Sequence, residues 1–193
     1  MAWAVRETSP AEAEQAVAAI VLAFSTDPAA RWSYADPAQY LAHFPAVVRA
    51  FGGRAFARGT AWHVDGFAGA ALWLPPGVGS DEEALLAVMQ RSVPAERQAE
   101  VSAVFEQMGG YHPGEPHWYL PLIGVDPAHQ REGHGSALLR HALARCDRDH
   151  APAYLESSNP ANIPLYQRHG FDVLGTIQAG SSPRITPMLR AAR

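Results

Sequence analysis

Hydrophobic positions recur along this chain in two rhythms, one typical of amphipathic helices and one typical of strands. Helical spacing covers residues 10–24, 37–51, 81–108 with a break at Pro94, 133–150 and 162–169. Strand-like runs cover 3–7, 60–65, 67–74, 117–125, 153–157, 171–176 and 184–189. An Asp-Gly pair between the second and third runs favours an antiparallel hairpin. The order of these elements predicts an α/β fold of the α+β kind, with helices flanking a mixed sheet.

The most informative stretch runs from Leu122 to Leu139, where an apolar strand enters a glycine-containing turn that opens an amphipathic helix. Gly133 and Gly135 stand where that helix begins. Unpaired N–H groups at a helix N-terminus bind phosphate oxygens, and glycine removes side chains that would keep the ligand away. The spacing fits neither a Walker A loop nor a dinucleotide-binding fingerprint. The stretch therefore predicts a pyrophosphate site of another design.

The segment Gln130-Arg131-x-Gly133-x-Gly135 resembles the acyl-CoA-binding motif of the GCN5-related N-acetyltransferase (GNAT) superfamily. A second block, 153–171, carries an Asn, a Tyr and a Gly-Phe pair in the order found in that superfamily. From Pro113 onward the chain is most similar to the puromycin N-acetyltransferase-like members. The resemblance implies a GNAT acyl-CoA N-acyltransferase fold, with a central, mostly antiparallel mixed sheet in one domain over 1–193. It also implies acetyl-CoA (coenzyme A) as the cofactor.

In this superfamily the turn binds the pyrophosphate through backbone N–H groups, and the pantetheine arm lies between two strands that splay apart. Glu132 departs from the family pattern, and a carboxylate beside a pyrophosphate weakens binding unless it points to solvent. Asn159 and Asn162 are alternatives for the Asn that contacts pantetheine, and either could instead cap a helix. The residues expected at the cofactor are Ile123, Val125, Gln130, Arg131, Gly133, His134, Gly135, Ser136, Asn159, Asn162 and Tyr166.

Acyl transfer from a thioester to an amine needs a base for the amine and an acid for the departing thiolate. Tyr166 is the candidate acid, because a phenol is protonated at neutral pH and the superfamily has a Tyr in this role at this point of its motif. The base stays open among Glu115, His117, Tyr119 and Glu156. Glu156 ranks slightly ahead of His117 because its strand is expected to be buried.

Composition narrows the function classes. The chain has 193 residues, 48% of them hydrophobic, and a net charge of −4 with scattered basic residues, which gives no reason to expect nucleic acid. No run is long and apolar enough to suggest a membrane partner, and the single Cys146 favours the cytoplasm. His129, His134 and His141 match no common ligand spacing, so no metal is expected.

These observations predict an acetyl-CoA-dependent N-acetyltransferase that acts on a primary amine of a small molecule by direct attack in a ternary complex. The alternatives are a non-catalytic acyl-CoA sensor and a protein or peptide N-acetyltransferase. Residues specific for the acceptor are expected within 1–110, above all in the insert 81–108, and Trp73 is placed near the acceptor pocket. A homodimer is compatible with the aromatic residues if they form an exposed patch.

Overall fold

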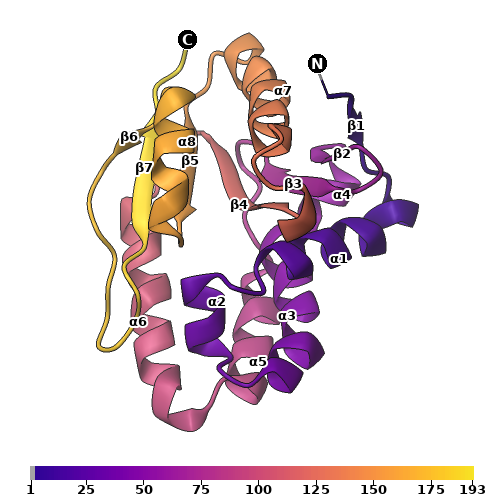
Figure 1. Cartoon of the computed structure of the whole chain (residues 1–193). Coiled ribbons are helices and arrows are strands. Elements are labelled where there is room, and N and C mark those ends of the chain that lie inside the picture. The colour runs from indigo at the N-terminus through magenta and orange to yellow at the C-terminus, as the bar shows by residue number, and fades with distance from the viewer. Residues whose placement is uncertain (1–2) are drawn as a thin grey trace.

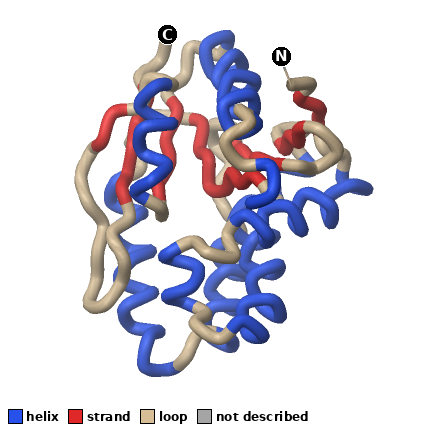
Figure 2. The backbone as a smooth tube through the Cα atoms, viewed as in Figure 1, coloured by secondary structure: helices blue, strands red, loops and turns tan. Residues whose placement is uncertain are grey.

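A computed structural model describes residues 3–193 and contains a seven-stranded sheet in the order β1-β2-β3-β4-β5-β7-β6 (Figures 1 and 2). All neighbouring strands run antiparallel except β4 and β5, which are parallel. The predicted mixed, mostly antiparallel sheet is therefore confirmed. The strands are β1 (Val5–Glu7), β2 (Ala61–Val64), β3 (Gly69–Leu74), β4 (Trp118–Val125), β5 (Ala153–Ser157), β6 (Asp172–Val173) and β7 (Thr186–Arg190).

Helices cover both faces of this sheet and one end of the molecule. Figure 1 shows α2, α3 and α5 gathered at the lower end with α6 along the left side, whereas α7 and α8 lie at the upper end. Among the described residues, no helix has the length and apolarity needed to cross a membrane. The α-helices are α1 (Ala13–Ala23), α2 (Pro28–Ser33), α3 (Pro37–Gly52), α4 (Arg54–Ala57), α5 (Glu82–Ser92), α6 (Ala95–Tyr111), α7 (His134–Arg148) and α8 (Ile163–Arg168). Short 3-10 helices are η1 (Pro10–Glu12), η2 (Pro127–His129) and η3 (Pro160–Asn162).

The predicted elements are present with small shifts of their ends, and two short α-helices, α2 and α4, were not predicted. α2 begins where the Asp27 carboxylate accepts from the N–H groups of Ala29 and Ala30, followed by Pro28 at the first helical position. α4 has only four residues. The predicted strand at 171–176 shrinks to the two residues of β6.

Two hydrophobic cores lie on the two faces of the sheet. The first packs α1 and α3 against the sheet and includes Ile20, Val48 and Leu72. The second lies beneath α7, where Leu138 and Cys146 are fully buried. Trp73 was expected near the acceptor pocket, and this expectation was wrong. Its side chain is buried in the second core, because its position in β3 directs it to the α7 side of the sheet.

β4 is irregular at the point where it separates from β5. Leu72 pairs with Leu122 but Leu74 pairs with Tyr119, so β4 carries one extra residue in between, beside Pro121, which has no N–H to donate. The parallel pairing of β4 with β5 ends at Leu120. Beyond it the two strands diverge and leave backbone groups unpaired in the sheet, as the splayed pair of strands was expected to do.

Candidate active site

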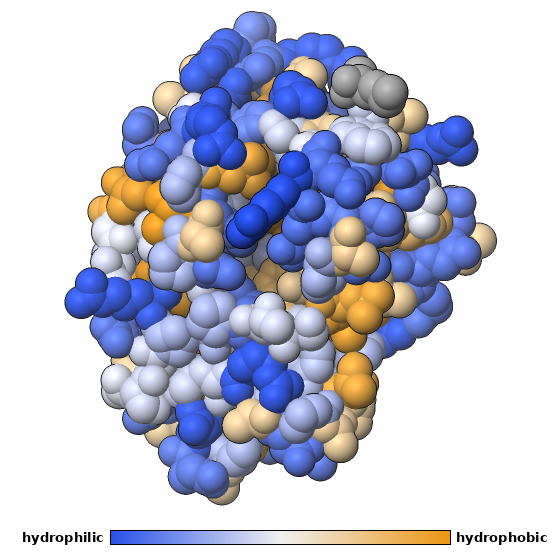
Figure 3. Space-filling view, viewed as in Figure 1, coloured by the Kyte–Doolittle hydropathy of each residue, from blue (hydrophilic) through white to orange (hydrophobic). Residues whose placement is uncertain are grey.

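A cleft of about 630 Å³ opens where β4 and β5 diverge. One side consists of β4, the turn after it, the start of α7, β5 and α8, and the other side consists of α2, α3 and α6. Figure 3 shows this face of the molecule hollowed near its centre. Every residue expected at the cofactor lines this cleft, and so does Glu156, whereas His117 does not. The two sequence blocks thus meet in one place.

The turn after β4 has an unusual backbone that shapes the start of α7. Arg131 and Gly133 have φ angles of 66° and 96°, so two left-handed residues flank Glu132. Gly133 is the N-cap of α7. The Gln130 amide donates to the Val125 carbonyl at 3.2 Å, which ties the turn to the end of β4. Such a turn directs successive N–H groups toward one concave site, which suits an anion.

Glu132 does not present a free carboxylate to this turn. Its Oε2 lies 3.3 Å from Nε2 of His134 and 3.9 Å from Nδ1 of His129. The His134 ring is buried against Trp3, with 4.2 Å between ring centroids, and the Trp3 indole N–H donates to the Glu132 carbonyl at 2.8 Å. The carboxylate that departs from the family pattern is therefore engaged by two imidazoles.

These imidazoles include two of the three considered for a metal. Atoms of His129, Glu132 and His134 lie within 4.8 Å of one another, whereas His141 packs on Trp62. A metal-ligating imidazole normally has its second nitrogen hydrogen-bonded. Nδ1 of His134 is buried without such a partner among residues 3–193. The cluster is therefore explained by the contacts of the two imidazoles with the Glu132 carboxylate.

The Ser136 hydroxyl is already hydrogen-bonded to neighbouring side chains. Its hydroxyl oxygen lies 2.8 Å from Nε2 of His169 and accepts from Arg140 at 2.9 Å. Ser136 is left with its backbone N–H for a ligand. Arg168 of α8 lines the cleft and adds a cation that the sequence reasoning missed, although its place two residues after Tyr166 was visible.

The two candidate asparagines differ in what their side chains do. The Asn159 amide oxygen accepts from the Ala161 N–H at 3.0 Å and caps η3. Asn162 is exposed, lines the cleft, and has no side-chain hydrogen bond within the described part of the chain. Of the two, Asn162 has the amide that is free to meet a ligand.

Tyr166 sits on α8, packed against Phe171 and 6% exposed. Burial and the nearby Asp27 carboxylate raise the pKa of Tyr166, so its hydroxyl stays protonated at neutral pH. Asp27 is a buried cleft residue that the sequence reasoning missed. It caps α2 and also accepts from the Ser158 hydroxyl at 2.6 Å, which joins α2 to the segment after β5.

Glu156 has a side chain only 3% exposed on β5. Its Oε2 accepts from the Tyr119 hydroxyl at 2.8 Å, and its Oε1 lies 3.5 Å from Nε2 of His112, within ion-pair reach. Burial and the Glu156 carboxylate raise the pKa of both Tyr119 and Tyr154, so these phenols stay protonated beside it. His112, which no sequence pattern indicated, completes this surround.

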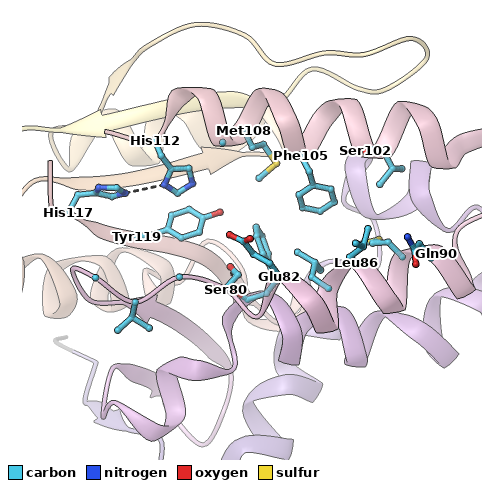
Figure 4. A pocket seen from close by; sticks show the side chains of 18 of the residues that line it. Ser80, Glu82, Leu86, Gln90, Ser102, Phe105, Met108, His112, His117 and Tyr119 are labelled. Atoms are coloured by element: carbon cyan, nitrogen blue, oxygen red, sulfur yellow. Dashed lines mark hydrogen bonds between the residues drawn. The ribbon is translucent and has the colours of Figure 1, made fainter. Parts of the chain in front are cut away.

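His117 lies in a second cavity of about 1030 Å³ between α5 and α6. Figure 4 shows side chains of α6 and of α5 pointing toward each other across this cavity, with His112, His117 and Tyr119 at one end. His117, one residue before β4, and Tyr119 line this same cavity, as strand parity predicts. His117 contacts His112 and not the cleft, so it is not placed to act directly on a substrate there.

Comparisons with known proteins agree with this geometry. A model described as the acetyltransferase (GNAT) family matches residues 82–171. An uncharacterized N-acetyltransferase of Schizosaccharomyces pombe is 26% identical over 132 residues, which cover 59% of this chain and 51% of that protein. The chain therefore spans about half the length of this curated relative.

Solved structures share the fold over the whole chain. A protein of Corynebacterium glutamicum described as histone acetyltransferase HPA2 and related acetyltransferase has a TM-score of 0.73 at 24% identity, covering 100% of this chain and 98% of its own. The polyamine N-acetyltransferase of Drosophila melanogaster has a TM-score of 0.60 at 12% identity, covering 98% and 99%. The fold is that of GNAT acetyltransferases, and the family match covers residues 82–171 of this chain.

Proposed function

We propose that this protein transfers an acetyl group from acetyl-CoA to a primary amine of a small molecule. The observation that carries the proposal is the meeting of four features in one cleft. These are the anion-binding turn, the diverging strands, a protonated phenol and a buried carboxylate. A module that only binds acyl-CoA needs the first two and has no use for the others.

The cofactor fits the residues that line the cleft. The N–H groups from Arg131 to Ser136 would bind its pyrophosphate, with Arg131 and Arg168 as nearby cations. The backbone of Ile123 and the N–H of Val125, whose carbonyl already accepts from Gln130, would hold the pantetheine arm together with the Asn162 amide. Acetyl-CoA supplies the thioester that is cleaved.

The chain's own groups then manage the protons. Glu156 accepts the proton of the acceptor's ammonium group, which frees the amine to attack. N–H groups near Val125 stabilise negative charge on the carbonyl oxygen. Tyr166 donates its proton to the departing sulfur and regains one from the attacking nitrogen, which loses its remaining extra proton as the amide forms. The raised pKa of Tyr166 keeps its hydroxyl protonated between turnovers throughout the neutral and mildly alkaline range.

The opposite side of the cleft favours a small acceptor. This side is aromatic and enclosed, with Trp32, Tyr34 and Phe44 in its lining. The Asp27 carboxylate also lines the cleft and would attract a cationic amine. Two structural neighbours are described as acting on agmatine or polyamines, which are small cationic amines. An aminonucleoside, as the resemblance to puromycin-type enzymes implies, is a narrower proposal within the same class.

The test is thiol release from acetyl-CoA across agmatine, polyamines, arylalkylamines, puromycin and a lysine peptide. We expect turnover with at least one small amine. Tyr166→Phe keeps the ring and its packing, so we expect kcat to fall at least about tenfold while CoA affinity stays within about twofold. Tight CoA binding with no turnover on any amine would favour a sensor, and turnover on the peptide alone would favour a protein acetyltransferase.

A further inference from the structure

His112 stands between the cleft and the second cavity, and the mechanism above does not use it. It is the C-cap of α6, and its two ring nitrogens face different partners. Nε2 lies 3.5 Å from Oε1 of Glu156, and Nδ1 lies 3.1 Å from Nε2 of His117. Nδ1 of His117 lies 2.8 Å from the carbonyl oxygen of Glu115. A continuous line of polar contacts therefore leads from the buried carboxylate to the cavity.

These contacts fix which nitrogen carries each hydrogen. The Glu115 carbonyl can only accept, so the N–H of neutral His117 must be on Nδ1. Nε2 of His117 is then an acceptor, and the donor facing it must be Nδ1 of His112. Nε2 of neutral His112 is left as a bare acceptor directed at the Glu156 carboxylate. Two acceptors face each other there until a proton arrives between them.

Two phenol rings, the end of α6 and one carboxylate surround His112. Its ring packs against Tyr119 and Tyr154, with centroid distances of 4.6 Å and 4.5 Å, and both phenols are held protonated. The C-terminal end of α6 adds the negative end of its dipole. Of the charged groups on neighbouring elements, Glu156 faces the ring directly, and Glu82 of α5 and Glu115 line the cavity.

Glu156 needs such an exit because it is almost closed to solvent. Each turnover would leave one proton on it, taken from the acceptor's ammonium group, and this proton must leave before the next turnover. The cavity between α5 and α6 has room for about 30 waters at about 30 Å³ each. His112 and His117 line this cavity, whereas Glu156 does not, and the cavity shares Phe105 with the lining of the cleft.

We propose that His112 and His117 relay this proton from Glu156 to the cavity between α5 and α6, an inference that rests on the proposed function. The proton on Glu156 passes to Nε2 of His112, and the Nδ1 proton of His112 passes to Nε2 of His117. His117 then loses its Nδ1 proton to water. One proton enters and one leaves. Each ring then loses its Nε2 proton and takes up an Nδ1 proton by exchange with water in the cavity that both rings line, which restores both starting tautomers. Both histidines act through Glu156 and are positioning residues.

The kinetic test compares wild type with His112→Gln and His117→Gln on an accepted amine. We expect kcat to fall about tenfold or more in His112→Gln, less in His117→Gln, with KM for both substrates within about twofold. Added imidazole should restore kcat of His112→Gln in proportion to its concentration. His43→Gln on α3, a half-buried residue that lines neither the cleft nor the second cavity, is the control and should leave kcat and its imidazole response unchanged. A kcat that is unaffected in His112→Gln, or reduced without rescue, overturns the relay.

A second measurement does not depend on turnover. Nitrogen-15 NMR of histidine-labelled protein reports which ring nitrogen of each imidazole is protonated. We expect the Nδ1–H tautomer for both His112 and His117, with a shift of the His112 Nε2 signal in Glu156→Gln. The opposite tautomer at either residue overturns the relay while leaving acetyl transfer intact. Failure of turnover on every amine with these tautomers present overturns the proposed function alone.

Discussion

The two sides of the cleft offer different groups to the ligands proposed for them. The cofactor side, formed by β4, the turn at 126–133, the start of α7, β5 and α8, offers mainly backbone N–H groups and unpaired strand edges. The acceptor side, formed by α2, α3 and α6, offers side chains such as Trp32, Tyr34 and Phe105. Backbone recognition depends on a local conformation set by a few neighbouring residues, whereas a side-chain pocket depends on packing between distant segments. The comparison explains why the cofactor is easier to infer than the acceptor.

The largest effect should come from Glu156, the proposed base, which lies on β5. In Glu156→Gln, Tyr119 can still donate to the side chain, but no base remains. We expect kcat/KM for the amine to fall at least about 100-fold, with CoA affinity within about twofold. Stopped-flow or steady-state thiol release with a CoA titration measures both. A loss below tenfold would assign the base elsewhere, with Asp27 as the next buried carboxylate in the cleft.

A smaller effect on CoA binding should come from the glycines of the turn. Comparing two of them separates the need for a left-handed backbone from the need for space without a side chain. In Gly133→Ala, the φ of 96° becomes strained, at a cost of about 1–2 kcal/mol. We expect CoA binding to weaken about tenfold as the turn relaxes. The matched control is Gly135→Ala, because a Cβ there would lie 3.6 Å from Leu165 and 3.7 Å from Val125, an ordinary contact. Calorimetric CoA titration of both variants checks this, and equal losses would contradict the conformational explanation.

The smallest effect should come from the charge beside the turn. Glu132→Gln removes a half-exposed carboxylate that already faces two imidazoles. We expect CoA binding to tighten by about two- to threefold at low salt and to show no change at high salt, because exposed charges are screened. Glu96→Gln on the exposed face of α6 is the control. Weaker binding in Glu132→Gln would show that the carboxylate holds the turn in shape more than it repels the ligand.

The sequence predicted the cofactor half well because its signals are local. Strand, glycine turn and helix follow one another without a break from Trp118 to Arg148, and each has its own periodicity or turn chemistry. α2 was missed although Asp27 and Pro28 form a cap and a helix start, because six residues are too few for periodicity to show. β6 is short because its register is set by pairing with β7, which local propensity does not reveal.

The contacts between side chains in the site could not be predicted from the sequence, for a different reason. His112 and Glu156 are 44 positions apart in the sequence, and only the folding of α6 against the sheet brings them to 3.5 Å. His117 was rightly linked to Tyr119 by strand parity, but parity gives a face and not the cavity that this face meets. The engagement of Glu132 by His129 and His134 likewise depends on the left-handed turn between them.

The core beneath α7 has a practical consequence for any assay of this protein. Cys146 is its single sulfhydryl group, it is fully buried there, and burial raises the pKa of its thiol to about 12. Aromatic disulfide reagents react with thiolates, so the folded protein should give almost no colour by itself. Reaction of one equivalent of reagent per chain would then report unfolding of the protein. Any further colour would measure the coenzyme A thiol that the reaction releases.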